Sequence, residues 1–170
     1  MHKGYSVFHA ASRRQRIPQG FTLIEAMVVV ALVAILAALA APSFNTMIAN
    51  QRVSSAAQEL QTLLSFARAE AVYKRTPTAV TATGQKWEAK VVPDGPLLRG
   101  IVASDAVTVT PGSANGLTFD VTGAAKPAAG TATTYVLTLS ATQATRVQCL
   151  RVTGAGLIRQ DKLPAGQTCS

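Results

Sequence analysis

The chain has 170 residues and a mass of 17.7 kDa, which allows one ordinary domain with a modest appendage and excludes a large multidomain enzyme. It carries 16 Lys and Arg against 8 Asp and Glu, a net charge of +8, yet only 14% of its residues are charged, which excludes a polyelectrolyte tail. Hydrophobic residues make up 48% of the chain, and they are concentrated in one segment near the N-terminus.

The concentrated apolar segment runs from Phe21 to Ala41 and holds a single charged residue, Glu25. At a helical rise of about 1.5 Å per residue, this length is just sufficient to cross the hydrocarbon core of a bilayer. Residues 1–20 contain Lys and Arg but no acid, and cationic flanks stay on the cytoplasmic side. We therefore expect a single-pass membrane protein with a cytoplasmic N-terminus and with residues 42–170 outside the cytoplasm.

A secretory signal peptide and a plain signal anchor are the alternatives for this start. The apolar run is longer than the usual hydrophobic region of about 7 to 15 residues, and no small-x-small cleavage site follows it. A carboxylate such as Glu25 within an apolar span is also unfavourable unless it has a partner or lies near the interface. These features argue against simple secretion.

A one-sided pattern follows Pro42 and predicts that the helix continues to about Tyr73. Its apolar residues recur at steps of three and four, which is typical of a helix that buries one stripe: Val53, Ala56, Ala57, Leu60, Leu63, Leu64, Ala67 and Ala71. We divide the helix into a transmembrane half, residues 21–42, and an amphipathic half, residues 43–75. Pro42 predicts a bend, and Pro77 predicts the end of the helix.

The remainder, residues 76–170, is rich in Thr, Val and Gly and predicts an antiparallel β-rich head. The segment Gly123–Thr133 reads as a mobile loop, because it holds little hydrophobic bulk. The fold class is therefore α+β, with a long N-terminal helix and a C-terminal β-rich globular head. The candidate strands are Thr78–Thr83, Trp87–Val92, Val107–Thr110, Leu117–Thr122, Tyr135–Ser140, Arg146–Thr153 and Leu157–Gln160.

Two stretches of the sequence carry a family resemblance. The segment Gly20-Phe21-Thr22-Leu23-Ile24-Glu25 after a basic leader, followed by an aliphatic span and Pro42, resembles the class III signal of type IV pilins and type II secretion pseudopilins. The continuation is similar to the GspH/FimT family of minor pilins and pseudopilins, through Ala57-Gln58-Glu59-Leu60, Phe66-Ala67-Arg68-Ala69-Glu70-Ala71-Val72 and the segment from Val152 to Arg159.

This resemblance implies a processing site and an assembly residue. A prepilin peptidase in the inner membrane would remove the basic leader, residues 1–20, by cutting between Gly20 and Phe21, and would methylate the new amino group of Phe21. The head would then lie in the periplasm. In filaments of this family, the residue corresponding to Glu25 pairs with the amino terminus of a neighbouring subunit. An attraction of this kind is strong in a low-dielectric helical core. The resemblance also implies an inner-membrane assembly platform and other minor and major pilins or pseudopilins as partners.

The two cysteines, Cys149 and Cys169, face an oxidising compartment in this topology and are expected to form a disulfide. Closing a loop of about 20 residues is worth on the order of 3 kcal/mol in the chain-entropy model. We expect no metal site, because both histidines, His2 and His9, lie in the leader. With no catalytic motif in evidence, we also expect no cofactor and no enzymatic activity.

The basic balance of the C-terminal region raises a DNA-binding alternative. From residue 146 onward the chain holds four cationic residues, Arg146, Arg151, Arg159 and Lys162, against Asp161 alone. Some proteins that resemble this family bind DNA in natural transformation through a Gly-Arg-x-Arg motif, and the matching stretch Gly156-Leu157-Ile158-Arg159 keeps only the second arginine. A solvated basic strand face is the other interpretation of these residues.

Three functions therefore stay open at this stage. The first is a structural minor pilin that takes part in the assembly and priming of a type IV pilus. The second is a pseudopilin of the H type in a type II secretion machine, and the third is a DNA-binding minor pilin. The C-terminal disulfide loop favours the first, because it resembles the clamp of pilus subunits.

Overall fold

The computed structural model describes residues 20–111, 116–128 and 133–169, and only the backbone at 40–42. The predicted leader, residues 1–19, and the side chain of Pro42 lie outside this part. The chain forms two compact units, Met1–Leu39 and Ala40–Ser170, which we describe separately. The bend predicted at Pro42 concerns the junction of the two units and stays a prediction.

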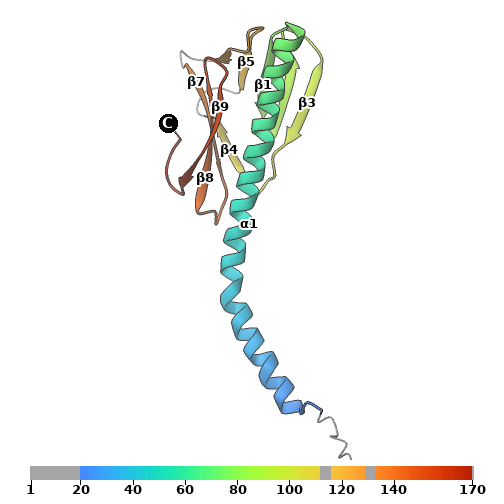
Figure 1. Cartoon of the computed structure of the whole chain (residues 1–170), viewed down its shortest axis with the longest axis vertical. Coiled ribbons are helices and arrows are strands. Elements are labelled where there is room, and N and C mark those ends of the chain that lie inside the picture. The colour runs from blue at the N-terminus through green and yellow to red at the C-terminus, as the bar shows by residue number, and fades with distance from the viewer. Residues whose placement is uncertain (1–19, 112–115, 129–132, 170) are drawn as a thin grey trace, which may run out of the picture. The chain divides into compact units, whose positions relative to one another are not determined.

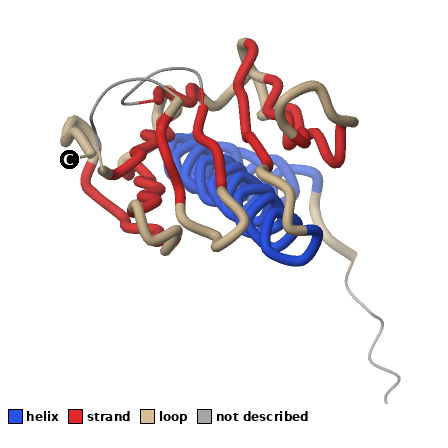
Figure 2. Tube along the Cα trace, turned by 90° about the horizontal axis from the view of Figure 1, so that it is seen from above, coloured by secondary structure: helices blue, strands red, loops and turns tan. Residues whose placement is uncertain are grey.

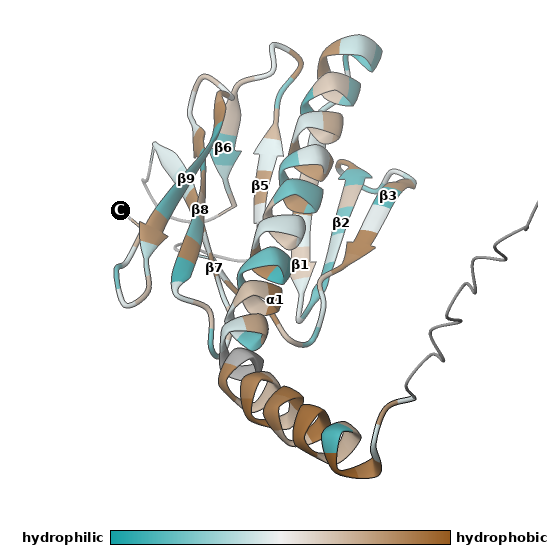
Figure 3. Cartoon of the chain, turned by 60° about the horizontal axis from the view of Figure 1, so that its bottom comes forward, coloured by the Kyte–Doolittle hydropathy of each residue, from teal (hydrophilic) through white to brown (hydrophobic). Residues whose placement is uncertain are grey.

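One long helix, α1 (Leu23–Lys74), comprises 52 residues and runs through both units (Figure 1). In the first unit its apolar side chains are exposed all around, and Figure 3 colours this stretch brown. The exposed fraction of Leu39, for example, is 73%. By length and composition, no single helix of the described chain qualifies as a membrane span, whereas Leu23–Leu39 and Ser43–Lys74 qualify when taken together.

In the second unit, α1 buries the stripe that the sequence predicts. Val53, Leu60 and Ala67 are at most 1% exposed, and the other five residues of the stripe are also buried. Gln58 and Glu59 on the opposite face are exposed. The three- and four-residue spacing thus places one face of the helix in the core, as expected.

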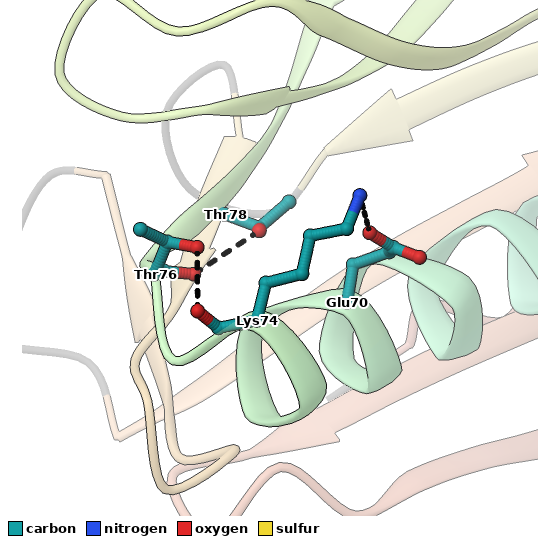
Figure 4. A network of polar contacts seen from close by, with 4 residues as sticks. All are labelled: Glu70, Lys74, Thr76 and Thr78. Atoms are coloured by element: carbon teal, nitrogen blue, oxygen red, sulfur yellow. Dashed lines mark hydrogen bonds and ion pairs between the residues drawn. The ribbon is translucent and has the colours of Figure 1, made fainter.

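The C-terminal end of α1 is closed by local polar contacts (Figure 4). Lys74 Nζ lies 2.6 Å from Glu70 Oε2, one helical turn earlier. Arg75 follows with a φ of 52°, the left-handed conformation that commonly ends helices. The Thr76 hydroxyl donates to the Lys74 carbonyl oxygen, and the Thr78 hydroxyl donates to the Thr76 carbonyl oxygen. The helix therefore ends before Pro77, as the sequence predicts.

Two antiparallel sheets complete the second unit. The first has the strand order β3-β2-β1-β5-β6 and the second has the order β4-β7-β8-β9. Seen along α1, the strands lie around one side of the helix (Figure 2). The strands are β1 (Thr78–Thr83), β2 (Lys86–Val91), β3 (Leu97–Val102), β4 (Thr108–Pro111), β5 (Gly116–Phe119), β6 (Ala125–Pro127), β7 (Thr134–Ser140), β8 (Arg146–Thr153) and β9 (Ile158–Pro164).

Two strands contradict the sequence-based expectations. β3 was not expected, because Leu97–Val102 does not alternate cleanly between apolar and polar residues and contains Gly100. β3 is an edge strand with both faces largely exposed. The guanidinium group of Arg99 lies over the Phe66 ring, with Arg99 Cζ 5.7 Å from the ring centroid. The prediction of a loop over the whole segment Gly123–Thr133 is wrong, because β6 occupies part of it and pairs with β5; residues 129–132 lie outside the described part of the chain. β6 has only three residues, too few to show a period.

The core joins the helix stripe to the inner faces of both sheets. Trp87 from β2, Phe119 from β5 and Tyr135 from β7 are its largest side chains, and each is at most 1% exposed. Along β7, Tyr135, Leu137 and Leu139 are buried and alternate with partly exposed residues, as predicted. Contributions from one helix and two sheets make the second unit a single packed body.

Candidate functional site

The N-terminal end of α1 carries the residues that the sequence singled out for processing and assembly. Gly20 and Phe21 precede the helix, and Phe21 is 81% exposed. An added Cβ at Gly20 would meet nothing within 4 Å. The peptide bond between these two residues is therefore sterically open in the isolated chain. Glu25 lies in the first turn of the helix.

Thr22 has a role here that was not among the sequence-based predictions. The Glu25 backbone N–H donates to Thr22 Oγ1 at 3.3 Å, and the Ala26 N–H donates to the Thr22 carbonyl at 3.1 Å. Thr22 is thus the N-cap of α1, and Glu25 occupies the third helical position of a Thr-x-x-Glu capping-box sequence. A Thr followed three residues later by a Glu, directly before an apolar run, is the sequence pattern that predicts such a cap. The Glu25 carboxylate also interacts favourably with the helix dipole, whose positive end lies at the N-terminus.

At the other end of α1, Arg68 ties two turns of the head to the helix. Its Nε donates to the Gly123 carbonyl oxygen at 3.0 Å, and its Nη2 donates to the Ala155 carbonyl oxygen at 3.3 Å. The Gly123 turn is shaped by Asp120, whose Oδ1 accepts hydrogen bonds from Thr122. These bonds from Thr122 hold the pKa of Asp120 below its usual value.

Gly156 completes this contact in the turn between β8 and β9. Its φ of 76° lies in the left-handed region, and an added Cβ would overlap the Gly123 carbonyl oxygen and approach Arg68 Nε to 2.8 Å. The motif-like stretch Gly156–Arg159 therefore begins with a glycine that the packing of two turns requires. No partner or ligand is needed to explain that glycine.

The four candidate DNA-binding residues are divided between the two faces of the β8–β9 hairpin. The register pairs Arg151 with Arg159 and Gln148 with Lys162, and directly opposed residues share a face. Arg146 lies two residues before Gln148, so Arg146 and Lys162 share the face that includes buried Leu150 and Val152. Arg151 and Arg159 share the opposite face. The structure thus forms two cationic pairs and no single basic strip along this hairpin.

The outward pair has one acidic neighbour. Arg151 Nε lies 3.7 Å from Asp161 Oδ2, and both side chains are substantially exposed. A partly solvated ion pair of this length contributes little to stability. The two opposed arginines, with Arg159 exposed and Arg151 partly exposed, fit the interpretation of these residues as a solvated basic strand face.

Arg146 and Lys162, both exposed, line an open groove of about 530 Å³ between α1 and the β8–β9 hairpin of the second sheet. Within the groove, Asn50 makes two hydrogen bonds to Thr145: Asn50 Nδ2 donates to Thr145 Oγ1 at 3.1 Å, and Asn50 Oδ1 accepts from the Thr145 N–H at 3.1 Å. The groove is lined by Ser43, Thr46, Met47, Asn50, Gln51, Ser54, Thr145, Arg146, Gln148 and Lys162.

Cys149 and Cys169 are joined by a disulfide, with a Cα–Cα distance of 5.7 Å. Cys149 is fully buried on the outward face of β8. The bond ties the C-terminal segment to β8, which lies inside the second sheet between β7 and β9. Within the described ranges, no three His, Cys, Asp or Glu side chains lie close enough together to hold a metal ion.

Comparison with known families matches both parts of the chain. The model described as type II transport protein GspH matches residues 56–156, and the prokaryotic N-terminal methylation motif matches residues 16–41. The second match contains Gly20, Phe21 and Glu25. No curated protein gives a significant match.

Solved structures share the fold. The type IV minor pilin FimU of Pseudomonas aeruginosa (strain PAO1) matches in two crystal forms. The first crystal form has a TM-score of 0.57 at 24% identity, and the match covers 65% of this chain and 89% of FimU. The second has a TM-score of 0.54 at 25% identity, and the match covers 64% of this chain and 91% of FimU. The minor pseudopilin EpsH of the Vibrio cholerae type 2 secretion system matches with a TM-score of 0.51 at 11% identity, covering 68% of this chain and 99% of EpsH.

Proposed function

Because the chain belongs to the GspH family of minor pilins and pseudopilins, we propose that it is a minor pilin that takes part in type IV pilus assembly as a non-enzymatic filament subunit. The observation that carries this choice of system is the likeness to the minor pilin FimU, at up to 25% identity over about nine-tenths of that protein. The disulfide-tied C-terminus supports it, because it resembles the clamp of pilus subunits.

The proposal includes a processing step and a topology. A prepilin peptidase cuts between Gly20 and Phe21 and methylates the Phe21 amino group, which the exposed peptide bond and the methylation-motif match support. The apolar stretch of α1 then anchors the subunit in the inner membrane, with the head in the periplasm. This arrangement delivers the subunit to an inner-membrane assembly platform and to other pilins, with Glu25 available to pair with a neighbouring amino terminus.

A bulky residue at position 20 tests the processing step. We expect Gly20→Val to leave the precursor uncut, because the peptidase needs a small residue next to the cleaved bond. Immunoblotting for the head, in cells that hold the peptidase, would detect the larger precursor band. Gly20→Ala is the control and is expected to yield the mature band. A mature band of normal intensity from Gly20→Val would contradict the cleavage assignment.

A type II secretion pseudopilin is the second candidate, favoured by the family description and by the likeness to EpsH. Deletion of the gene in its own host, with complementation, separates the two systems. We expect surface pili sheared from the cells to vanish or fall sharply and to return on complementation. Unchanged pili with a loss of protein secretion would establish the pseudopilin and overturn the pilus assignment.

DNA binding is the weakest of the three functions, because the β8–β9 hairpin presents its cationic residues as two separate pairs. Of the outward pair, Arg151 and Arg159, only Arg159 matches the family motif by position. Salt-dependent titration of the chain with duplex DNA tests it, since phosphate contacts weaken as salt rises. No retention at low salt would end the DNA-binding proposal.

A further inference from the structure

The groove lined by Arg146 and Lys162 has the chemistry of a phosphate site. It presents two cationic side chains together with hydroxyl and amide groups that can donate hydrogen bonds, and among the described residues no Asp or Glu lines it. Charge-assisted hydrogen bonds from such groups are the strong ones that hold phosphate oxygens. The groove therefore favours a monoanionic or dianionic phosphate group over a neutral ligand.

The two cationic residues are neighbours on the hairpin. Lys162 is opposite Gln148 and Arg146 is opposite Pro164, so their backbone positions are diagonal neighbours, about 7 Å apart, on the same face. Within the described part of the chain, neither has an acidic partner. Asp161 is adjacent to Lys162 in sequence but lies on the opposite face, where it pairs with Arg151. A bound anion would relieve the repulsion between these two like charges.

Position along the chain identifies the source of the phosphate. Ser43 and Thr46 line the groove and follow Ala41, the last residue of the apolar span, by two and five residues. At about 1.5 Å per residue, they lie within roughly 8 Å of the end of that span. The headgroup layer of a bilayer is about 5–8 Å thick on each side. Covalent continuity alone thus keeps Ser43 and Thr46 near the level of lipid headgroups. Thr145, next to Arg146, is bonded to Asn50, nine residues or about 14 Å beyond the span, so Arg146 reaches a headgroup with its long side chain extended toward the bilayer.

Exposed apolar side chains mark the same level. Phe44, Met47 and Ile48 follow the span on α1 and are 62%, 70% and 48% exposed, and Met47 also lines the groove. Apolar side chains beside cationic ones are typical of surfaces that sit at a membrane interface. We propose that this groove binds the phosphate headgroup of an anionic phospholipid, with phosphatidylglycerol as the probe, while the subunit is held in the membrane.

This inference rests on the proposed function, because it needs a membrane-anchored subunit. It adds a lipid-binding step before the subunit enters a filament. An acidic side chain of a neighbouring subunit is the competing occupant of the groove. The lipid is favoured, because the groove begins within two residues of the apolar span and needs no assembled partner.

The test uses the full chain reconstituted in phosphatidylcholine bilayers that contain a trace of spin-labelled phosphatidylglycerol or spin-labelled phosphatidylcholine. Electron paramagnetic resonance measures the fraction of each labelled lipid that the protein immobilises. We expect the wild type to prefer phosphatidylglycerol and the double variant Arg146→Gln/Lys162→Gln to lose most of that preference. The leader cations are the same in both proteins, so the difference reports the groove.

The matched control is Arg151→Gln/Arg159→Gln, which removes the same charge from the opposite face of the same hairpin and is expected to keep the preference. The swap Arg146→Lys/Lys162→Arg is expected to keep it as well. Fluorescence of the single tryptophan, Trp87, buried in the core, verifies that each variant is folded. An equal loss of the lipid preference in Arg146→Gln/Lys162→Gln and in Arg151→Gln/Arg159→Gln would mean a general charge effect and would overturn the proposal.

Two further outcomes would also overturn it. Loss of the preference on adding inorganic phosphate, but not chloride at equal ionic strength, would assign the groove to free phosphate. If the variant Arg146→Gln/Lys162→Gln kept its lipid preference but was no longer recovered in filaments, the groove would be assigned to a neighbouring subunit. Failure of the wild type to enter the bilayer would instead refute the membrane anchor, and with it the proposed function.

Discussion

Gly156 is fixed by two independent features of its site, the left-handed backbone and the Gly123 carbonyl oxygen packed where a Cβ would stand. We expect Gly156→Ala to destabilise the head, because the backbone strain alone is worth about 1–3 kcal/mol and the clash also displaces Arg68. Chemical denaturation of the full chain in detergent, followed by Trp87 fluorescence, measures the free energy of unfolding.

Gly84→Ala is the matched control for this prediction. Gly84 also has a left-handed φ, 61°, but an added Cβ there meets nothing within 4 Å. The variant therefore carries the backbone strain without the clash. Equal losses of unfolding free energy in the two variants would refute the packing role assigned to Gly156.

Tyr135 is fully buried, and its hydroxyl has no hydrogen-bond partner within the described part of the chain. An unpaired buried hydroxyl is unfavourable, so we expect Tyr135→Phe to leave stability unchanged or to raise it by about 1 kcal/mol. The same denaturation assay measures this change. A loss of more than about 1 kcal/mol would show that the hydroxyl makes a favourable contact.

The same residue predicts a pH dependence. Burial raises the pKa of Tyr135 to about 12 from the ordinary value near 10. Above pH 10 the unfolded chain loses this proton while the folded chain keeps it, so stability falls as the pH rises from 10 to 12. We expect this part of the alkaline loss to be absent from Tyr135→Phe. Parallel stability curves for the two proteins over that range would contradict the assignment.

At the scale of elements, the disulfide stabilises the β8–β9 hairpin and the C-terminal segment together. The bond joins residues 20 positions apart, so its loss is expected to lower the free energy of unfolding by on the order of 3 kcal/mol. We expect Cys149→Ala/Cys169→Ala to show this loss, and reductant to destabilise the wild type but not the variant. Equal stability of the two proteins under oxidising conditions would contradict a stabilising role.

Local periodicity explains which elements the sequence could predict. The buried stripe of α1 repeats over five turns, and β7 (Thr134–Ser140) alternates along its whole length, so the sequence predicts both with nearly the observed bounds. β3 and β6 have no usable period, since β3 is exposed on both faces and β6 is too short. Their pairing depends on β2 and β5, which a local pattern does not contain.

The candidate site divides in the same way. A contiguous motif predicts the roles of Gly20, Phe21 and Glu25, and the Thr22 cap lies within the same motif. The separation of Arg146 from Arg151 onto opposite faces follows from their odd spacing on one strand. The partners of Arg68 lie 55 and 87 residues away, so only the folded chain reveals them.

At the scale of the whole molecule, Glu25 links a single subunit to its filament in the proposed function. We expect Glu25→Ala to be processed and inserted in the membrane but poorly recovered in sheared filaments, because no carboxylate remains to pair with a neighbouring amino terminus. Immunoblots of the membrane and sheared fractions measure both quantities.

Glu25→Gln and Thr22→Ala separate pairing from capping. Gln can replace Glu in a capping box but carries no charge, so Glu25→Gln is expected to fail in incorporation as Glu25→Ala does. Thr22→Ala removes the cap, which is worth about 1 kcal/mol, and keeps the charge, so it is expected to incorporate. Recovery of Glu25→Gln at wild-type level would show that the charge is not needed.

The covalent link between Cys149 and Cys169 also has a mechanical consequence for a subunit under tension. β9 is an edge strand, held by β8 alone within its sheet, so a force applied to the C-terminal segment acts on β9 before any other strand of that sheet. Without the link, residues 149–169 would add a contour length of about 70 Å as they extended. With the link in place, the ends of that segment stay 5.7 Å apart between Cα atoms, so the subunit gains almost no length when the hairpin opens.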